Sequence, residues 1–480
     1  MAVVQPIQAP DASVALGACF ERQKAAYHAH PVPSVAERRA DLRALKALLN
    51  DNREAIIAAT TADYGCRSRH ETLFGEVISV TDGINDCIRK LGRWAKPQRR
   101  HVDLSLFAGG RNRVVPQPLG CVGIIVPWNF PLFLAFGPLS AALAAGNRAM
   151  VKMSENSRHL SRLLIELAPR YFSTDKVCFL EETGGVGIAF SRIPFDLLFF
   201  TGSGETGRKV MAAAAANLTP VVLELGGKSP AVIDPRYPLA KAVQRILFVK
   251  QFNAGQICVN VDYVFVQRDQ VDAFVAEAQR WTARHVPDIH SRDYTALIDE
   301  RSCQRMLDTL ADARSKGARV INLTPHQAPD PASRKVPLHL VLDTTPDMII
   351  RQRETFGPLL MVLPYDGPQD VIEHVRAHDR PLAFYPFSRD RKLVEHYLTH
   401  TMSGGVTVND ALFHVAQHDM PFGGVGASGM GQYHGFDGFR TFSKMRPVFH
   451  QAPISAMRFL QPPYGRVADL VYRFLVWLKS

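Results

Sequence analysis

The first hundred residues carry apolar side chains at helical spacing. Leucine and alanine recur every three or four positions through 38–49, the pattern of an amphipathic helix with one buried face. Ser34 and Glu37 stand three residues apart just before this run. They predict a capping box, because each side chain can bond a free backbone N–H of the first helical turn. Residues 10–100 are therefore predicted to be mostly helical.

After residue 120 the pattern changes to short, continuous apolar runs. Cys121–Val126 is rich in β-branched residues, as expected of a strand buried on both faces of a parallel sheet. Helical segments such as Arg208–Ala216 separate it from similar runs at Ala149–Met153, Val177–Leu180, Leu197–Thr201 and Val221–Leu225. A second alternating series extends from Val259–Val266 to Val406–Asn409. The alternation predicts an α/β protein built from doubly wound parallel sheets.

Two segments depart from this alternation. Leu104–Pro118, with paired glycines at 109 and 110, predicts a β-hairpin that leaves the main body. At the other end of the chain, apolar residues recur at helical spacing within 466–480, with charged residues around them. They predict a C-terminal amphipathic helix within 462–480, flanked by Tyr472 and Trp477.

Composition and charge narrow the partners. A chain of 480 residues exceeds one hydrophobic core, so two or three domains are expected. The net charge of +11 suits an anionic partner, but the basic residues are scattered and nucleic-acid binding is not expected. Seven cysteines without a CxxC pair argue against disulfides and a structural zinc, and no metal site is predicted. With neither a signal-peptide pattern nor a membrane-spanning run, a cytoplasmic location is predicted.

One cysteine differs from the others in its surroundings. Cys258 ends FNAGQIC, a small, polar turn between two apolar runs. Upstream, Glu224 precedes paired glycines, and Asn129 lies in the motif PWNFP. A thiol, a carboxylate and an amide are the nucleophile, base and oxyanion donor of covalent acyl chemistry on a carbonyl. Taken singly, they can also be a buried inert thiol, a salt-bridged carboxylate and a turn residue bonded to its own backbone.

Two segments are candidates for binding a nucleotide. GSGETG at 202–207 follows a predicted strand and opens a helix, so its glycines permit close backbone approach and the helix N-terminus favours a pyrophosphate. The same pattern also occurs in tight strand-to-helix turns that bind nothing. Lys152 and Glu155 end another predicted strand, where both can reach ribose hydroxyls or simply form an exposed charge pair.

Taken together, these motifs resemble those of the aldehyde dehydrogenase superfamily, over about residues 20–450. The matching stretches are PWNFP (127–131), FTGS (200–203), ELGGKSP (224–230), FNAGQIC (252–258), ETFGP (354–358) and PFGGVGASGMG (421–431). Asp262-Tyr263, residues 428–435 and residues 441–443 look most like the class 3 branch, which includes fatty, aromatic and coniferyl aldehyde dehydrogenases. The resemblance implies two doubly wound parallel-sheet domains plus a bridging β-hairpin for oligomerisation.

The resemblance also implies a role for each motif. Cys258 would attack the aldehyde, Asn129 would hold the oxyanion, and Glu224 would activate the water that hydrolyses the thioester. The cofactor would be NAD, with NADP as the alternative, because a carboxylate at Glu155 competes with a 2′-phosphate. It would contact Trp128, Lys152, Glu155, Gly202, Ser203, Gly207, Leu225, Gly226, Glu354 and Phe356.

The expected substrate is an aromatic, coniferyl-type aldehyde or a medium- to long-chain aliphatic one, since the residues placed near the substrate tunnel are mostly apolar. These are Phe130, Phe133, Leu134, Ile257, Val259, His414 and Phe422, each of which can also be ordinary core packing. Two other functions are open. A CoA-acylating enzyme is disfavoured by the water-activating Glu224, and a catalytically idle binding protein by the intact Cys258, Asn129 and Glu224.

The motifs also suggest a division of the chain. Residues 1–99 and 119–225 are expected to bind NAD(P), and residues 226–430 to form the catalytic domain. Residues 100–118 and 443–453 would bridge the subunits of a homodimer. The C-terminal helix would pack over a partner subunit or the substrate entrance. A weak contact with a membrane surface is the alternative interpretation of that helix.

Overall fold

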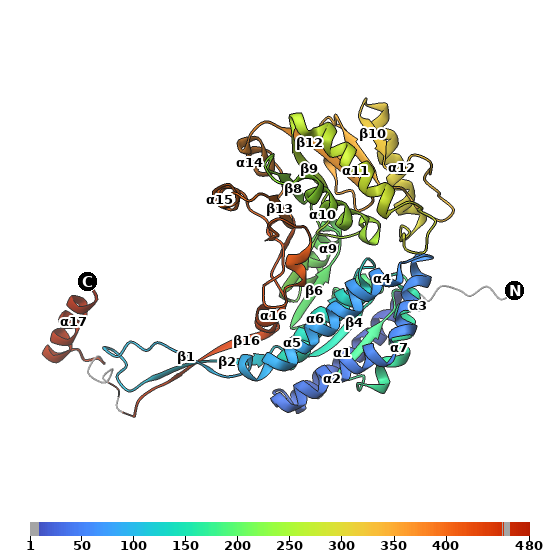
Figure 1. The fold of residues 1–480 in the computed structure, drawn as a ribbon. Helices are drawn as coiled ribbons and strands as arrows, with labels where there is room; N and C mark the ends of the chain where they lie inside the picture. The colour runs from blue at the N-terminus through green and yellow to red at the C-terminus, as the bar shows by residue number, and fades with distance from the viewer. Residues whose placement is uncertain (1–8, 454, 456–460) are drawn as a thin grey trace.

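The computed structural model describes residues 9–453, 455 and 461–480, and three sheets organise them (Figure 1). The first large sheet is formed by β15 (Gly429–Met430), β7 (Val221–Glu224), β6 (Leu197–Thr201), β3 (Cys121–Ile125), β4 (Arg148–Lys152) and β5 (Val177–Leu180), in that order. Five of these strands are those predicted from the apolar runs, and their bounds are confirmed to within one residue.

Successive side chains of these strands enter different cores, as the pleat of a strand requires. Val122 and Ile124 pack with α2 (Val35–Asp51), α5 (Ser79–Trp94) and α6 (Pro131–Ala145). Cys121 and Ile125 pack on the other face with α1 (Ala9–Ala29), α8 (Val186–Phe190) and α9 (Gly204–Ala215). Burial of both faces explains why β3 is apolar at every position. The predicted capping box of Ser34 and Glu37 is present at the start of α2.

The second large sheet has seven strands. Their order is β10 (Arg319–Asn322), β11 (His339–Leu342), β12 (Leu359–Tyr365), β9 (Tyr263–Gln267), β8 (Pro230–Ile233), β13 (Ala383–Phe387) and β14 (Gly405–Val406). The helices of this half are α10 (Leu239–Gln251), α11 (Val271–His285), α12 (Glu300–Ser315), α13 (Ile349–Gln352), α14 (Pro368–Ala377) and α15 (Arg391–His400). Both large sheets are mainly parallel, with one antiparallel edge strand each, β10 and β15.

Two strand predictions in this second half were wrong in their bounds. The run predicted at Val259–Val266 becomes a strand only from Tyr263, because Asn260 forms a turn in which its N–H donates to the Ile257 carbonyl (3.0 Å). The run predicted at Val406–Asn409 is a strand only at Gly405–Val406. Asn409 adopts a left-handed backbone (φ 61°), which ends the extended conformation.

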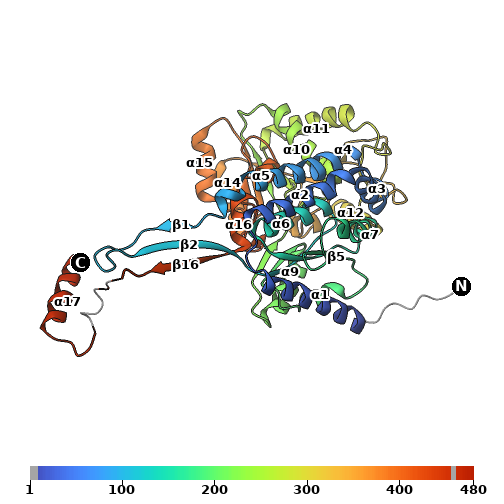
Figure 2. The same cartoon turned by 90° about the horizontal axis from the view of Figure 1, so that it is seen from below.

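A three-stranded antiparallel sheet extends from the body as an arm (Figure 2). It consists of β1 (Gln98–Arg100), β2 (Arg111–Pro118) and β16 (Ser443–His450), with β2 in the centre. The hairpin predicted from Leu104 therefore begins earlier, at Gln98. The remaining helices are α3 (Arg53–Tyr64), α4 (Arg69–Thr72), α7 (Arg158–Leu167) and α16 (Gly435–Thr441).

The C-terminal helix α17 (Arg466–Lys479) lies beside the far end of the arm in both views (Figures 1 and 2). Lys479 forms an ion pair with Asp103, in the loop that joins β1 to β2. Seven large apolar side chains of α17 are exposed: Val467, Leu470, Tyr472, Phe474, Val476, Trp477 and Leu478. Among the described residues, no helix is both long and apolar enough to cross a bilayer.

Candidate active site

The turn before Cys258 has an unusual backbone. Asn253, Ala254 and Gly255 all have positive φ angles, of 52°, 50° and 75°. Left-handed conformations are unfavourable for residues with a Cβ, so the surroundings must hold them. The Asn253 N–H donates to the buried carboxylate of Glu71 (3.0 Å). Glycine is required at 255 because a Cβ there would overlap the Gly357 carbonyl. This turn places Cys258 at the end of a fixed segment.

Asn129 lies in the loop between β3 and α6 and is 3% exposed. Its side-chain amide donates to the Gln256 carbonyl (3.2 Å), two residues before Cys258. The two motifs that were singled out from sequence for the oxyanion donor and the nucleophile are therefore joined directly by a hydrogen bond.

Cys258 and Asn129 lie where two cavities meet. One is a polar cleft of about 740 Å³, within the ~300–1,000 Å³ typical of small-molecule sites. The other is a smaller apolar cavity of about 80 Å³. Both residues contribute to the walls of both cavities, so a molecule in either one can reach the thiol.

Two carboxylates face this junction. Glu224, at the end of β7, is 2% exposed, and neither of its oxygens has a hydrogen-bond partner among the described residues. Burial without such partners raises its pKa well above the ordinary value, because the charged form is poorly solvated. Glu354 lies in the same cleft, and burial followed by the nearby Asp262 raises its pKa to about 8.

The Cys258 thiol is also hard to ionise in this environment. Burial raises its pKa to about 12, and Glu354 and Glu224 add to the effect by disfavouring a nearby negative charge. A reaction that uses the thiolate must therefore remove the proton when the substrate is in place.

Most of the predicted cofactor residues line the polar cleft: Trp128, Gly202, Ser203, Leu225, Gly226, Glu354 and Phe356. The Trp128 and Phe356 rings pack edge to face, 5.5 Å between centres. Ser203 caps α9 by accepting the N–H of Thr206 (3.3 Å), and Gly204 and Glu205 of the first helical turn also line the cleft. A polar cleft with a helix N-terminus and aromatic walls fits a dinucleotide.

Three predicted cofactor residues lie outside this cleft. Gly207 is buried in α9, where a Cβ would lie 2.8 Å from Leu225, so it allows close packing. Lys152 is buried and pairs with Glu182 (2.6 Å). Glu155 is exposed beyond the end of β4. The pairing of Lys152 with Glu182 was not predicted, because Glu182 carries no sequence motif.

The segment that bears Glu354 is held by a buried acid. Asp262 accepts from the Thr355 N–H (2.8 Å) and hydroxyl (2.6 Å), and it forms an ion pair with Lys228. Although burial opposes ionisation, Lys228 and Lys250 hold the pKa of Asp262 below its ordinary value. Asp262 was noticed in the sequence only as a family marker. Its position explains how Glu354 is kept at the cleft.

Six of the seven predicted tunnel residues line the apolar cavity: Phe130, Phe133, Leu134, Ile257, Val259 and Phe422. The exception is His414, which is absent from this wall. Its Nδ1 bonds the Thr407 hydroxyl (2.9 Å), and its ring stacks on Phe422, 6.0 Å between centres. Sequence reasoning missed further lining residues, among them Phe74, Phe252, Leu412, Phe413 and Tyr433. Phe252 and Phe413 adjoin recognised residues, but Phe74 comes from a distant helix.

A fold of two mainly parallel sheets, with a cysteine between a polar cleft and an apolar cavity, defines a nucleotide-dependent oxidoreductase of carbonyl compounds. The chain belongs to the aldehyde dehydrogenase family, whose sequence model matches residues 3–448. It is an aldehyde dehydrogenase, as the sequence motifs predicted.

Curated relatives match nearly the whole chain. A probable coniferyl aldehyde dehydrogenase of Pseudomonas aeruginosa is 46% identical, covering 96% of each chain. The coniferyl aldehyde dehydrogenase of Pseudomonas sp. (strain HR199) is 42% identical, covering 95% of each. Aldehyde dehydrogenase family 3 member A2 of Pongo abelii is 36% identical over 85% of this chain and 82% of its own. The resemblance to the class 3 branch is thereby confirmed.

Solved structures confirm the fold. AldH of Staphylococcus aureus, in a substrate-bound state, has a TM-score of 0.90 at 30% identity, covering 96% of this chain and 99% of that one. An aldehyde dehydrogenase of Mycobacterium tuberculosis complexed with NAD+ has a TM-score of 0.82 at 26% identity, covering 92% and 90%. An E. coli NADP dependent enzyme has a TM-score of 0.83 at 26% identity, covering 92% of this chain and 91% of that one.

Proposed function

We propose that this aldehyde dehydrogenase oxidises an aromatic, coniferyl-type aldehyde to the carboxylic acid, with NAD as cofactor and NADP as the alternative. The observation that carries the proposal is the position of Cys258 and Asn129 at the junction of the apolar cavity and the polar cleft. An aldehyde in the first and a nicotinamide in the second would both reach the thiol.

Cys258 would begin the reaction as the nucleophile. Its sulfur bonds to the aldehyde carbon, the C=O bond becomes a C–O⁻ bond, and the thiol proton passes to a base. Water that fills the polar cleft can take that proton, so that Glu224 remains available for the later hydrolysis. The Asn129 amide and the Cys258 backbone N–H would stabilise the oxyanion.

The residues suited to hold the cofactor are Ser203 with the N-terminus of α9, Glu354 and Phe356, all on the wall of the cleft. The chemistry supplied by a bound nicotinamide is the two-electron oxidation of the thiohemiacetal to a thioester. Gly226 leaves room for Glu354, whose carboxylate a Cβ at 226 would overlap.

Glu224 would then complete the reaction. A water attacks the thioester carbon and gives its proton to Glu224, the C–S bond breaks, and Cys258 leaves as the thiolate. A buried carboxylate whose oxygens have no hydrogen-bond partner in the described part of the chain suits an attacking water. This feature favours hydrolysis over acyl transfer to CoA.

The apolar cavity supports the substrate class. Among the residues that the structure describes, no charged side chain lines it, and its wall includes Phe74, Phe130 and Phe252. The Phe130 and Phe252 rings stack, 5.9 Å between centres. Flat aromatic walls favour an aromatic aldehyde, and the 46% and 42% identical relatives are named for coniferyl aldehyde. A medium- to long-chain aliphatic aldehyde is the second candidate, since most of the wall is apolar.

We also propose that the chain is divided into a cofactor-binding domain and a catalytic domain. Residues 1–99 and 119–225 would bind the cofactor, and residues 226–430 would carry the catalytic cysteine. The arm and α17 would form a homodimer contact, because the arm has two free edge strands and α17 exposes apolar side chains. Sedimentation of the purified protein would test the dimer. Vesicle binding by α17 without a dimer would favour the membrane alternative.

Turnover with coniferyl aldehyde, benzaldehyde, hexanal and decanal, each with NAD and with NADP, tests the proposal. We expect the wild type to prefer coniferyl aldehyde and Cys258→Ala to be inactive with all four. Preference for decanal would overturn the aromatic assignment. Turnover only on addition of CoA would overturn the hydrolytic one.

A further inference from the structure

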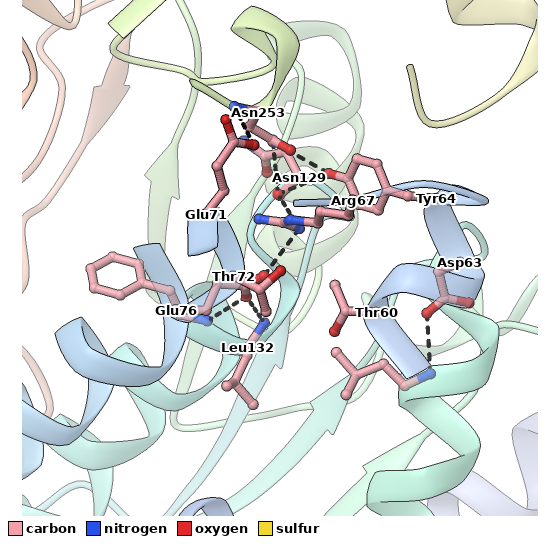
Figure 3. Close-up of polar contacts among 12 residues, drawn as sticks. Thr60, Asp63, Tyr64, Arg67, Glu71, Thr72, Glu76, Asn129, Leu132 and Asn253 are labelled. Carbon is pink, nitrogen blue, oxygen red and sulfur yellow. Dashed lines mark hydrogen bonds and ion pairs between the residues drawn. The ribbon is translucent and has the colours of Figure 1, made fainter. Parts of the chain in front are cut away.

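A cluster of charged side chains is buried behind Asn129 (Figure 3). Arg67 and Glu76 form an ion pair of 3.0 Å, and both side chains are 0% exposed. Tyr64 ends α3, Arg67 follows it, and Glu76 lies in the π-helix η1 (Leu73–Ile78). The cluster therefore comes from the N-terminal helices, outside every motif that identified the site.

Two donors of this cluster and one from the FNAGQIC motif converge on one backbone oxygen. The Asn129 carbonyl accepts from the Tyr64 hydroxyl (2.9 Å), the Arg67 guanidinium (3.1 Å) and the Asn253 side-chain amide (3.1 Å). A carbonyl oxygen has two lone pairs, so three donors exceed the number of partners that it usually has. The backbone at Asn129 is thereby fixed from behind, while its amide faces Gln256.

The same cluster holds the segment that follows Asn129. The second oxygen of Glu76 accepts the backbone N–H groups of Leu132 (2.6 Å) and Phe133 (3.2 Å), in the first turn of α6. An anion at this end of a helix is stabilised by the helix dipole. Arg67 and Glu76 thus hold the residue of the proposed oxyanion donor and the helix that begins after it.

Folding stability gives little reason for such a pair. Burying two charges costs free energy, and apolar residues of similar size are often as stable or more so. Two of the three guanidinium nitrogens of Arg67 have no hydrogen-bond partner among the described residues. Its remaining neighbours include the rings of Tyr64 (4.7 Å) and Phe130 (5.0 Å). The direct polar role of Arg67 is its contact with Glu76 and the Asn129 carbonyl.

We propose that Arg67, held by Glu76, is a positioning residue of the reaction, which fixes the Asn129 backbone so that the Asn129 amide meets the oxyanion formed on the substrate. The proposal rests on the proposed oxyanion role of Asn129. Arg67 itself lines neither the cleft nor the apolar cavity; it contacts their walls from behind, through Asn129 and Phe130.

A double-mutant cycle tests this positioning role. Removing an oxyanion donor lowers kcat by about 10²–10³-fold, so Asn129→Ala should fall in that range. Misplacing the donor is a partial loss, and Arg67→Met should lower kcat by about 10- to 100-fold. In the Asn129→Ala background the same substitution should change kcat by less than about threefold, because coupled residues are not additive. The KM for NAD should stay near the wild-type value.

Rates are expressed per reactive Cys258, counted by alkylation, so that unfolded protein does not enter the comparison. The double variant Arg67→Met/Glu76→Gln removes both charges and so serves as the test if Arg67→Met alone fails to fold. Its kcat should be lowered by the same factor that is expected for Arg67→Met. Arg69→Met is the matched control, because Arg69 forms an exposed pair with Glu54 (2.5 Å). It should retain the wild-type kcat.

The outcomes separate the two proposals. Equal loss from Arg67→Met in both backgrounds, or a wild-type kcat in Arg67→Met/Glu76→Gln, would overturn the positioning role and leave the proposed function intact. A wild-type kcat in Asn129→Ala would overturn the oxyanion role, and the positioning role with it.

Discussion

Replacing Glu224 by glutamine should separate the two halves of the proposed reaction. Glutamine keeps the shape of the side chain but cannot take a proton from water. General-base catalysis contributes about 10²–10⁴-fold. Glu354 is a second buried carboxylate near Cys258 and offers a partial substitute, so we expect the lower end of this range. Steady-state turnover should fall about 10²-fold, equivalent to about 2.7 kcal/mol.

The first half of the reaction should behave differently. Glu224 is one of the groups that raise the pKa of Cys258, so its removal makes the thiolate easier to form. Rapid-mixing absorbance should therefore show a burst of one NADH per site, followed by slow turnover. Mass spectrometry of the stalled enzyme should find the acyl group on Cys258, and added hydroxylamine should release it.

The absence of a burst together with slow turnover would refute this reasoning, because Glu224 would then serve the attack rather than the hydrolysis. Unchanged steady-state turnover would refute it as well. Glu354→Gln is the matched control, since it changes the other carboxylate of the cleft. It should raise the KM for NAD without accumulating the acyl enzyme.

Three further predictions concern the cofactor, pH and the C-terminal helix. Gly226→Ala should raise the KM for NAD, because the new Cβ displaces the Glu354 carboxylate. Gly367→Ala is the control and should leave this KM unchanged, because no atom lies within 4 Å of a Cβ built there. Equal effects of the two substitutions would contradict this reasoning. Burial raises the pKa of Glu71 to about 7 from 4.5. The free energy of unfolding of the wild type should therefore be highest below pH 4.5 and should fall as the pH rises to 7. Relative to Glu71→Gln the wild type should lose about 3 kcal/mol over that window in urea unfolding, and a constant difference would contradict the assigned shift. Deleting residues 466–480 should weaken the dimer in sedimentation and leave kcat unchanged, since no residue of α17 lines either cavity and the helix lies at the far end of the arm (Figure 1). A lower kcat would indicate that α17 reaches a partner's site.

Sequence reasoning succeeded where a single physical signal decides the outcome. Strand β3 has no polar side chain at any position because both of its faces are buried, and β5 and β6 were predicted at their observed bounds. It failed where one side chain redirects the backbone, as Asn260 does before β9. Cys258, Glu224 and Asn129 were selected by motif, and the structure brings them to one cleft.

Other parts of the site gave no local signal. Arg67, Glu71 and Glu76 are charged residues in a helical region, where such residues are usually solvated. Their burial depends on the loop of Asn129 and the turn of Asn253, which are distant in the sequence. His414 is absent from the cavity wall, and its ring instead bonds the Thr407 hydroxyl behind Phe422. Such arrangements depend on long-range packing, which single-sequence patterns do not contain.

The place of β15 bears on the order in which the chain can fold during its synthesis. β15 pairs with β7 directly at Glu224, yet more than two hundred residues separate the two strands, including the whole second sheet. On the ribosome the segment with Cys258 emerges before the first sheet can be completed. β16 closes the arm against β2 later still. Contacts between residues so distant in sequence form slowly. The second sheet and its helices can therefore fold as a unit before β15 pairs with the edge of β7. The carboxylate of Glu224 thus reaches its final surroundings among the last parts of the enzyme to form.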